Sequence, residues 1–330
     1  MRVRVMIALF ALTAGLGMFS QLARGDPLPG EILKFSQKPM IATPLGPAGT
    51  PPYFGHDELS TMYGVAPTPT APPYQGRFMA DDFADKFDTP VLHVRWWGSY
   101  MGSDHFTGGG VKQFYLGFES DVPADPAGGF SRPGVPLLQQ YLNKGPLAPA
   151  SGTFTETLIR GPDPILGESL YQYNAELGCP FQEKRDTVYW LKIVAMVNQA
   201  TDGPIQWGWH NRDYTIFDPL ASSPPVVVPG EHVDGFVGGG GGADPAPVFH
   251  FQDDAVQGTI ISQFITQCSG TTDQSAFEPT HYVTGLDGPD PIGQFSKDLA
   301  FELYTVPEPG MIGLVGVGLV MLSGRRRKHS

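Results

Sequence analysis

The sequence predicts an all-β protein, an antiparallel β-sandwich or jelly-roll-like domain. Three observations favour this fold class. The 330-residue chain contains 42 glycines and 33 prolines, which are unfavourable inside helices and frequent in turns. Aromatic residues make up 12% of the chain and charged residues only 16%, and aromatic side chains pack well on pleated sheets. Several short segments are also rich in apolar and aromatic residues and bounded by turn residues, as strands are.

The first element of the mature chain is a Pro-rich N-terminal strap at residues 26–75. Proline fixes φ and removes a backbone donor, so we expect this stretch to be extended, mostly irregular and largely at the surface. Its aromatic residues could dock onto the main sheet. The β-sandwich domain follows at residues 76–305. Its strands are predicted at residues 77–83, 89–100, 111–119, 154–159, 169–177, 187–198, 205–210 and 298–305.

Two of these strands allow a prediction of which side chains are buried. In 89–100, Leu92 and Trp96 share the apolar phase, which predicts that Trp96 lies in the core and Trp97 on the opposite face. The segment 187–198 has few polar positions, so we expect a central strand that is buried on both faces.

A Gly/Pro-rich insertion is predicted near residues 223–247, which include a run of glycines typical of a flexible linker. The insertion either separates two units or decorates a loop of one. We favour one domain, because the lone apolar strand at 298–305 needs a sheet to join.

The N-terminus has the pattern of a signal peptide over residues 1–25. Arg2 and Arg4 give a positive start, a mostly apolar stretch follows, and Ala23 and Gly25 place small residues at the two selective cleavage positions. We therefore expect a signal helix that signal peptidase removes after Gly25, and export from the cytoplasm.

The C-terminus, residues 306–330, has a second ordered pattern. It consists of Val306, Pro307, Glu308 and Pro309, then an uncharged run at 311–322, then a cluster that includes Arg325, Arg326 and Arg327. Twelve helical residues span about 18 Å, well short of the roughly 30 Å hydrocarbon core. We expect a short hydrophobic helix that inserts transiently in the inner membrane, with the arginines on the cytoplasmic side.

This C-terminal pattern resembles the PEP-CTERM sorting signal, in which a Pro-Glu-Pro tripeptide precedes a short hydrophobic segment and a terminal Arg cluster. The resemblance implies that an exosortase, a membrane transpeptidase, processes the tail. It also implies delivery to the cell envelope or the extracellular matrix of bacteria that make exopolysaccharide. The alternative is a plain C-terminal membrane anchor.

A second resemblance concerns the body of the chain. The segments 79–83, 94–100 and 206–210 are similar to an uncharacterised β-domain that recurs in exported proteins with PEP-CTERM tails. That family has no assigned activity, so the resemblance implies a β-sandwich and nothing about function.

The charge and the cysteine content limit which partners and which compartment the protein can have. The formal net charge is −12 and no basic run exists between the two ends, so we expect no binding to nucleic acid, which requires Lys and Arg. Signal peptidase and exosortase are the expected partners during export, and exopolysaccharide is a further candidate partner. Cys179 and Cys268 form either a single disulfide in an oxidising compartment or two unpaired thiols.

Two kinds of ligand are considered. Trp97 is a candidate glycan contact, because flat aromatic faces stack on sugar rings, although plain core packing is the alternative. Calcium is an open candidate at the acidic pairs Asp81-Asp82 and Asp253-Asp254 and at residues 287–290, where ordinary turn chemistry is the alternative. We otherwise predict no cofactor and no metal site.

Catalytic motifs are absent from the sequence. It contains no His-Glu-x-x-His pair, no Gly-x-Ser-x-Gly and no phosphate-binding Gly-x-x-x-x-Gly-Lys loop. We therefore predict that the protein is not an enzyme but a structural or adhesive envelope protein. A carbohydrate-binding module is the first alternative, and a polysaccharide-active enzyme that uses two carboxylates is the second.

Overall fold

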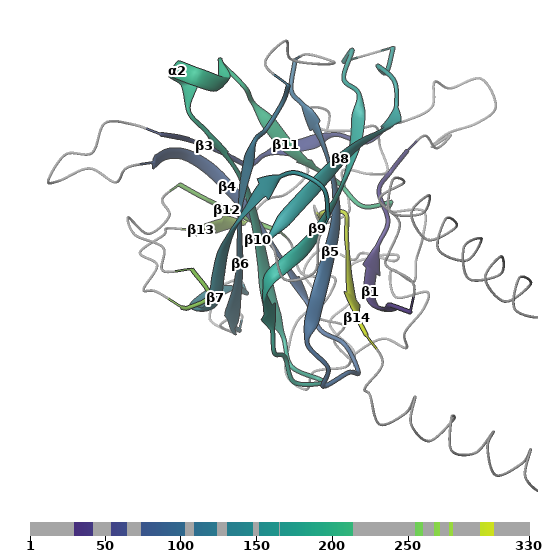
Figure 1. The fold of residues 1–330 in the computed structure, drawn as a ribbon, viewed down its shortest axis with the longest axis vertical. Coiled ribbons are helices and arrows are strands. Elements are labelled where there is room, and N and C mark those ends of the chain that lie inside the picture. Colours follow the sequence, from purple (N-terminus) through teal and green to yellow (C-terminus); the bar gives the residue numbers. More distant parts are fainter. Residues whose placement is uncertain are drawn as a thin grey trace, which may run out of the picture.

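The computed structural model describes residues 30–41, 54–64, 74–102, 109–123, 131–147, 152–164, 166–213, 255–259, 267–270, 277–279 and 298–306. This part of the chain is all-β, as predicted, and forms one curled sheet (Figure 1). The expected signal helix, the C-terminal hydrophobic helix and the insertion near 223–247 lie outside the described residues. Within the described ranges, no helix is long and apolar enough to cross a membrane.

The strands follow one another along the chain with a single short helix among the described residues. They are β1 (Ile32–Gln37), β2 (Asp57–Leu59), β3 (Thr61–Gly64), β4 (Tyr74–Phe83), β5 (Val91–Tyr100), β6 (Gln113–Val122), β7 (Arg132–Lys144), β8 (Thr153–Arg160), β9 (Leu170–Phe181), β10 (Tyr189–Val197), α2 (Gln199–Asp202), β11 (Trp207–His210), β12 (Val256–Gly258), β13 (Phe277–Pro279) and β14 (Phe301–Thr305).

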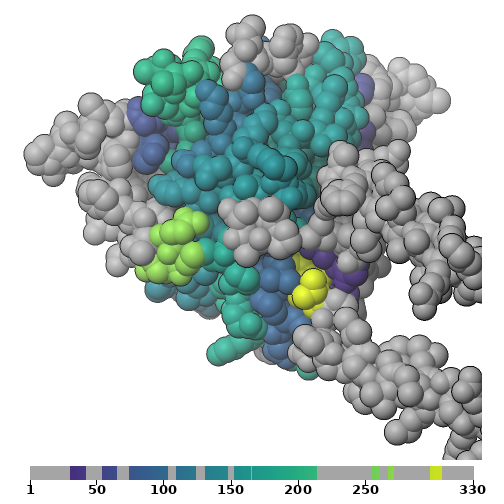
Figure 2. Space-filling model, in the orientation of Figure 1, coloured from purple at the N-terminus to yellow at the C-terminus, as the bar shows by residue number. Residues whose placement is uncertain are grey.

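Neighbouring strands in the sheet have the order β1, β14, β5, β9, β8, β7, β6, β10, β3, β4, β12, β13, and β11 pairs with both β5 and β2. The pairs β10–β3 and β7–β8 are parallel, and the other described pairs are antiparallel. Figure 2 shows the yellow atoms of β14 between the blue atoms of β5 and the purple atoms of β1. Strands from both sides of residues 214–254 therefore join one sheet.

Ser60 links the two halves of the curled sheet. β11 pairs with β5 in one half, and β2 leads through Ser60 into β3, which pairs with β10 in the other half. The Ser60 N–H donates to the carbonyl of Trp207 at 3.1 Å, and its carbonyl accepts from the N–H of Ala195 at 2.9 Å. Its hydroxyl donates to the carbonyl of Ile193. The sheet is therefore fastened into a half-barrel around a common core.

The main core fills the inside of the half-barrel with aromatic rings from both halves. Trp96 of β5 stacks on Tyr173 of β9 with ring centroids 5.4 Å apart, and Phe114 of β6 meets Trp207 of β11 edge-to-face at 4.8 Å. The indole N–H of Trp207 donates to the hydroxyl of Tyr173 at 3.0 Å. Gly98 lies against the Trp207 ring and the Gly208 carbonyl, so a Cβ at this position has no space.

A second, smaller cluster covers the outer face of β10. It contains the buried side chains Met62, Phe78, Tyr115, Val194 and Met196. Together with the main core, this cluster leaves every residue of β10 buried. The predicted central strand that is buried on both faces is therefore confirmed.

The eight predicted strands correspond to β4, β5, β6, β8, β9, β10, β11 and β14. Trp96 is completely buried in the main core, as its phase predicts. Leu92 is only half-buried and Val91 occupies the core instead. The register between β5 and β9 shifts between Val91 and His93. Such an irregularity inserts one residue and changes which side chains face the core.

Six strands are missing from the sequence prediction, namely β1, β2, β3, β7, β12 and β13. The expected mostly irregular strap contains β1, β2 and β3, so its regular structure was underestimated. β7 has 13 residues and includes Pro133 and Pro136, which normally argue against a strand. The register with β6 shifts on either side of Glu119, which faces Pro136. These irregularities accommodate the prolines inside a long strand.

Candidate binding pocket

A pocket of about 670 Å³ lies where the ends of β3, β4, β6, β7 and β10 meet α2. We call it the Tyr74 pocket. The polar and aromatic side chains that line it include Tyr74, Lys112, Gln113, Asn143, Asn198 and Asp202. None of the described residues that line it is a histidine, cysteine or serine.

An ion pair forms one side of the pocket. The ammonium of Lys112, just before β6, donates to Asp202 Oδ1 at 2.7 Å. The backbone N–H of Asn198 donates to Asp202 Oδ2 at 2.9 Å, and the Asn198 side chain caps α2 by accepting from the N–H of Ala200 at 3.1 Å. Burial alone raises the pKa of Asp202, but the hydrogen bonds from Lys112 and Asn198 outweigh it and lower the pKa below its usual value. The carboxylate is therefore ionised and held in place.

Two amide side chains lie beside the ion pair. Gln113 of β6 and Asn143 of β7 are direct partners in the antiparallel register. Gln113 Nε2 donates to Asn143 Oδ1 at 3.0 Å. The other half of each amide supplies one acceptor, Gln113 Oε1, and one donor, Asn143 Nδ2.

Tyr74 supplies the aromatic part of the pocket. Its side chain is half-buried and packs, with Tyr141, against the outer cluster on β10. Burial, with a further contribution from Tyr74, raises the pKa of Tyr141 to about 12. The Tyr141 phenol is therefore neutral near pH 7. A ring beside fixed donors and acceptors suits a ligand that carries both apolar faces and hydroxyl groups.

The prediction that Trp97 contacts a glycan is corrected by its burial. Trp97 is only 5% exposed and packs against Leu170 and Ala300. Ala300 lies just before β14, some 200 residues further along the chain. The local sequence around Trp97 therefore gives no indication that this segment covers it. Trp207 and Trp209 are also completely buried. None of these indoles offers an open face to a sugar.

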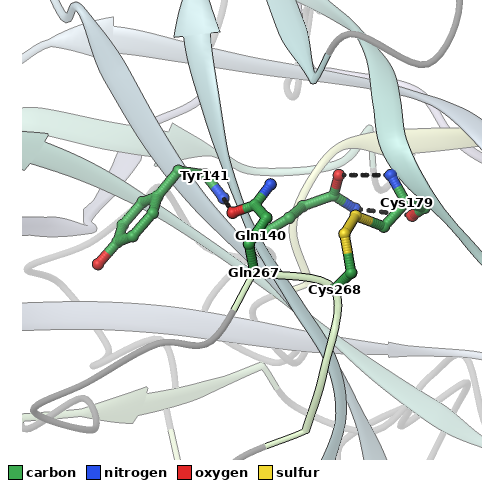
Figure 3. The surroundings of a disulfide bond; sticks show 5 residues. All are labelled: Gln140, Tyr141, Cys179, Gln267 and Cys268. Atoms are coloured by element: carbon green, nitrogen blue, oxygen red, sulfur yellow. Dashed lines mark hydrogen bonds between the residues drawn. A yellow bond between two sulfur atoms is a disulfide. The ribbon is translucent and has the colours of Figure 1, made fainter.

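Cys179 and Cys268 form a disulfide in the structure, with their Cα atoms 5.5 Å apart. Figure 3 shows how the surrounding hydrogen bonds hold both sides of this link. The Gln140 side chain donates to the Cys179 carbonyl at 3.0 Å and accepts from the Cys179 N–H at 3.1 Å. Gln267 Oε1 accepts from the N–H of Tyr141 at 3.0 Å. The disulfide therefore fastens residues 267–270 to β9, and the hydrogen bond from Tyr141 fastens them to β7.

The calcium candidate at Asp81-Asp82 gains no support from its surroundings. Asp81 is completely buried, and its carboxyl accepts from the N–H groups of Leu299 at 2.7 Å and Asp82 at 3.1 Å. Burial, with the nearby Asp298 and Asp82, raises the pKa of Asp81 well above its usual value. Among the described residues, Asp81 and Asp82 do not belong to a group of three ligand atoms close enough to share a metal ion.

The other predicted sites lie outside the described residues. They are the acidic residues at 253–254 and 287–290, the cleavage residues Ala23 and Gly25, and the sorting residues Pro307, Glu308, Pro309, Arg325, Arg326 and Arg327. Val306 is described, directly after β14, and is 45% exposed.

Sequence reasoning missed the Tyr74 pocket because its residues come from distant parts of the chain. Tyr74, Lys112, Asn143 and Asp202 belong to no common motif, and only the sheet order brings them together. Tyr74 follows a proline pair at 72–73 and falls within the predicted strap. No local signal separates it from the other tyrosines.

Comparison with known proteins identifies a family for this fold. Residues 33–229, more than half of the chain, match the family described as a domain of unknown function, DUF7901. The match begins within β1 and includes every element from β2 to β11. No curated protein and no solved structure matches the chain. The chain therefore belongs to the DUF7901 family.

Proposed function

We propose that the protein is exported to the bacterial cell envelope or extracellular matrix and has a structural or adhesive role there. The observation that carries this proposal is the disulfide between Cys179 and Cys268. Structural disulfides persist in oxidising compartments and are rare in the cytosol. The disulfide thus agrees with the signal peptide pattern at residues 1–25 and with the sorting pattern at residues 306–330.

The proposed route uses both ends of the chain. Signal peptidase removes residues 1–25, and the C-terminal hydrophobic segment then rests in the inner membrane with its arginines in the cytoplasm. An exosortase cuts near Pro307-Glu308-Pro309 and releases the β-domain. We infer no enzymatic activity for the β-domain.

Mass spectrometry of the exported protein tests this route. We expect a mature N-terminus at or near Asp26 and a C-terminus that lacks residues 325–328. Replacing Pro307, Glu308 and Pro309 with alanine is expected to leave the tail intact. The chain offers a matched control in Pro289-Asp290-Pro291, a second Pro-acid-Pro tripeptide, whose replacement with alanine should leave processing unchanged. Recovery of an exported form that retains the complete tail, or of a cytosolic form that retains Met1, contradicts the proposal.

Glycan binding is the second candidate function, and the Tyr74 pocket favours it. The pocket combines a half-buried tyrosine ring, two amides and a fixed ion pair within about 670 Å³. Sugar rings present apolar faces to aromatic side chains and hydroxyl groups to amides and charged groups. An exopolysaccharide of the surrounding matrix is the proposed ligand.

Replacing Tyr74 with alanine is expected to weaken binding to exopolysaccharide by about two- to tenfold, the value of one aromatic contact. Glycan arrays and titration calorimetry measure this change. Gln75 is the matched control, because it is the next residue of β4 and is exposed but does not line the pocket. Equal binding by Tyr74→Ala and Gln75→Ala, or no binding of the wild-type protein to any glycan, contradicts this function.

A further inference from the structure

Glu31, His93 and Glu176 form a buried cluster at the neighbouring strands β1, β14, β5 and β9. These are different strands from the ones whose ends form the Tyr74 pocket. His93 Nδ1 is 2.9 Å from Glu31 Oε2 and 3.8 Å from Glu176 Oε1. One ligand atom from each of the three residues lies within 4.8 Å of the others. The His93 side chain is completely buried, and those of Glu31 and Glu176 are 2% and 6% exposed.

The strand register explains why these side chains meet. His93 of β5 is the direct partner of Glu176 on β9 and of Tyr304 on β14. Side chains of direct partners lie next to each other on one face of a sheet. Glu31 reaches the same point from the residue before β1, the edge strand next to β14. The cluster therefore bridges the neighbouring strands from β1 to β9.

The imidazole of His93 is oriented by aromatic packing. Its ring lies against Tyr304 with centroids 5.0 Å apart. This position directs Nδ1 at both carboxylates, whereas Nε2 has no hydrogen-bond partner within the described ranges. Glu176 Oε1 likewise accepts no hydrogen bond from the described residues, although it is buried and points at Nδ1. A buried carboxylate oxygen without a hydrogen bond is costly unless a cation occupies its surroundings.

We propose that Glu31, His93 and Glu176 bind one Zn²⁺ ion. Zinc binds histidine nitrogen and carboxylate oxygen at about 2.0 to 2.2 Å in a tetrahedral arrangement, which separates neighbouring ligand atoms by roughly 3.4 Å. The two carboxylate oxygens lie 2.9 and 3.8 Å from Nδ1, on either side of this value. Calcium requires six to eight oxygen ligands, which one imidazole and two carboxylates do not supply.

Such an ion joins the start of β1 to the middle of the sheet. β1 pairs only with β14 among the described strands, so the ligand from Glu31 adds a second attachment for this edge strand. The site is independent of the proposed envelope function and of the Tyr74 pocket. A water molecule is the expected fourth ligand, as three protein ligands leave one tetrahedral position.

Zinc titration of the full chain, after dialysis against a chelator, tests the proposal. Calorimetry and elemental analysis are expected to give one Zn²⁺ per chain, and the melting temperature is expected to rise with zinc concentration. His93→Gln is expected to weaken zinc binding by at least about 100-fold, since the loss of mere supporting contacts at metal sites already costs ten- to 100-fold. Glu176→Gln preserves the shape of the side chain but removes its charge, and it should also weaken zinc binding.

His210→Gln is the matched control. His210 is also buried; its Nε2 donates to the Met40 carbonyl at 2.7 Å, and its Nδ1 lies 3.0 Å from Asp57 Oδ1. Among the described residues, His210 belongs to no group of three ligand atoms close enough to share a metal ion. It should retain wild-type zinc affinity. Three results overturn the proposal: absence of stoichiometric zinc in the wild-type protein, unchanged affinity in a folded His93→Gln or Glu176→Gln variant, or preference for Ca²⁺ over Zn²⁺. The first would mean that His93 contacts the two carboxylates without a metal.

Discussion

Replacing Cys179 and Cys268 with serine is expected to lower the free energy of unfolding by about 4 to 5 kcal/mol. The two residues are 89 positions apart, and a cross-link that closes a loop of this length removes that amount of conformational entropy from the unfolded chain. Urea denaturation of the oxidised wild-type protein and of the double variant measures the difference.

A local readout separates this effect from a general loss of structure. The N–H of Gln139 donates to the Ser269 carbonyl at 3.1 Å, and the N–H of Cys268 donates to the Gln139 carbonyl at 2.9 Å. These two amides should exchange with solvent faster in the variant than other β7 amides. A reducing agent should destabilise the wild-type protein and leave the double variant unchanged. Equal stability of the oxidised wild type and the variant would show that the disulfide does not stabilise the fold.

Replacing Lys192 with methionine is expected to cost about 3 to 5 kcal/mol of folding stability. Lys192 Nζ lies 2.6 Å from Glu119 Oε1, and both side chains are completely buried between β10 and β6. The ammonium is also 4.3 Å from the centre of the Phe78 ring. Methionine fills most of the lysine volume but removes the positive charge, so the Glu119 carboxylate loses its closest cation in a medium of low dielectric constant.

The double variant Lys192→Met with Glu119→Gln is the informative comparison. It removes both charges, and paired replacement of buried ions is often close to neutral. We therefore expect it to recover most of the stability that the single variant loses. Urea denaturation of the wild type, both single variants and the double variant gives the coupling energy. A single variant as stable as the wild type, or a double variant less stable than Lys192→Met, would argue against a buried ion pair that depends on both partners.

The local sequence pattern was sufficient to predict strands in which the apolar residues are concentrated on one face or fill both faces. Trp96 lies in the core with Val94, which precedes it by two residues on the same phase, and β10 is buried on both faces because nearly all its side chains are apolar. The irregularity beside His93 was not predictable, since it depends on the register with β9. β7 was missed because its prolines are tolerated only at irregular positions of the pairing with β6.

The candidate sites depend on contacts between distant residues and were therefore harder to predict. Trp97 has the composition of a sugar-binding residue, but the chain that covers it arrives from residue 300. Glu31, His93 and Glu176 have no metal-binding spacing in the sequence, and only the sheet order makes them neighbours. The sequence left two possibilities for Cys179 and Cys268, a disulfide or two free thiols, because sequence separation does not specify distance in space.

The position of β14 has a consequence for how the chain reaches its native state. This last strand lies between β1 and β5, so its two neighbours are among the first parts of the body to be synthesised. Among the described strands β1 pairs only with β14, so this pair forms only once residue 305 is available. Contacts of such long range form slowly because a large loop must close first. We therefore expect the part of the sheet around β14 to be among the last to form.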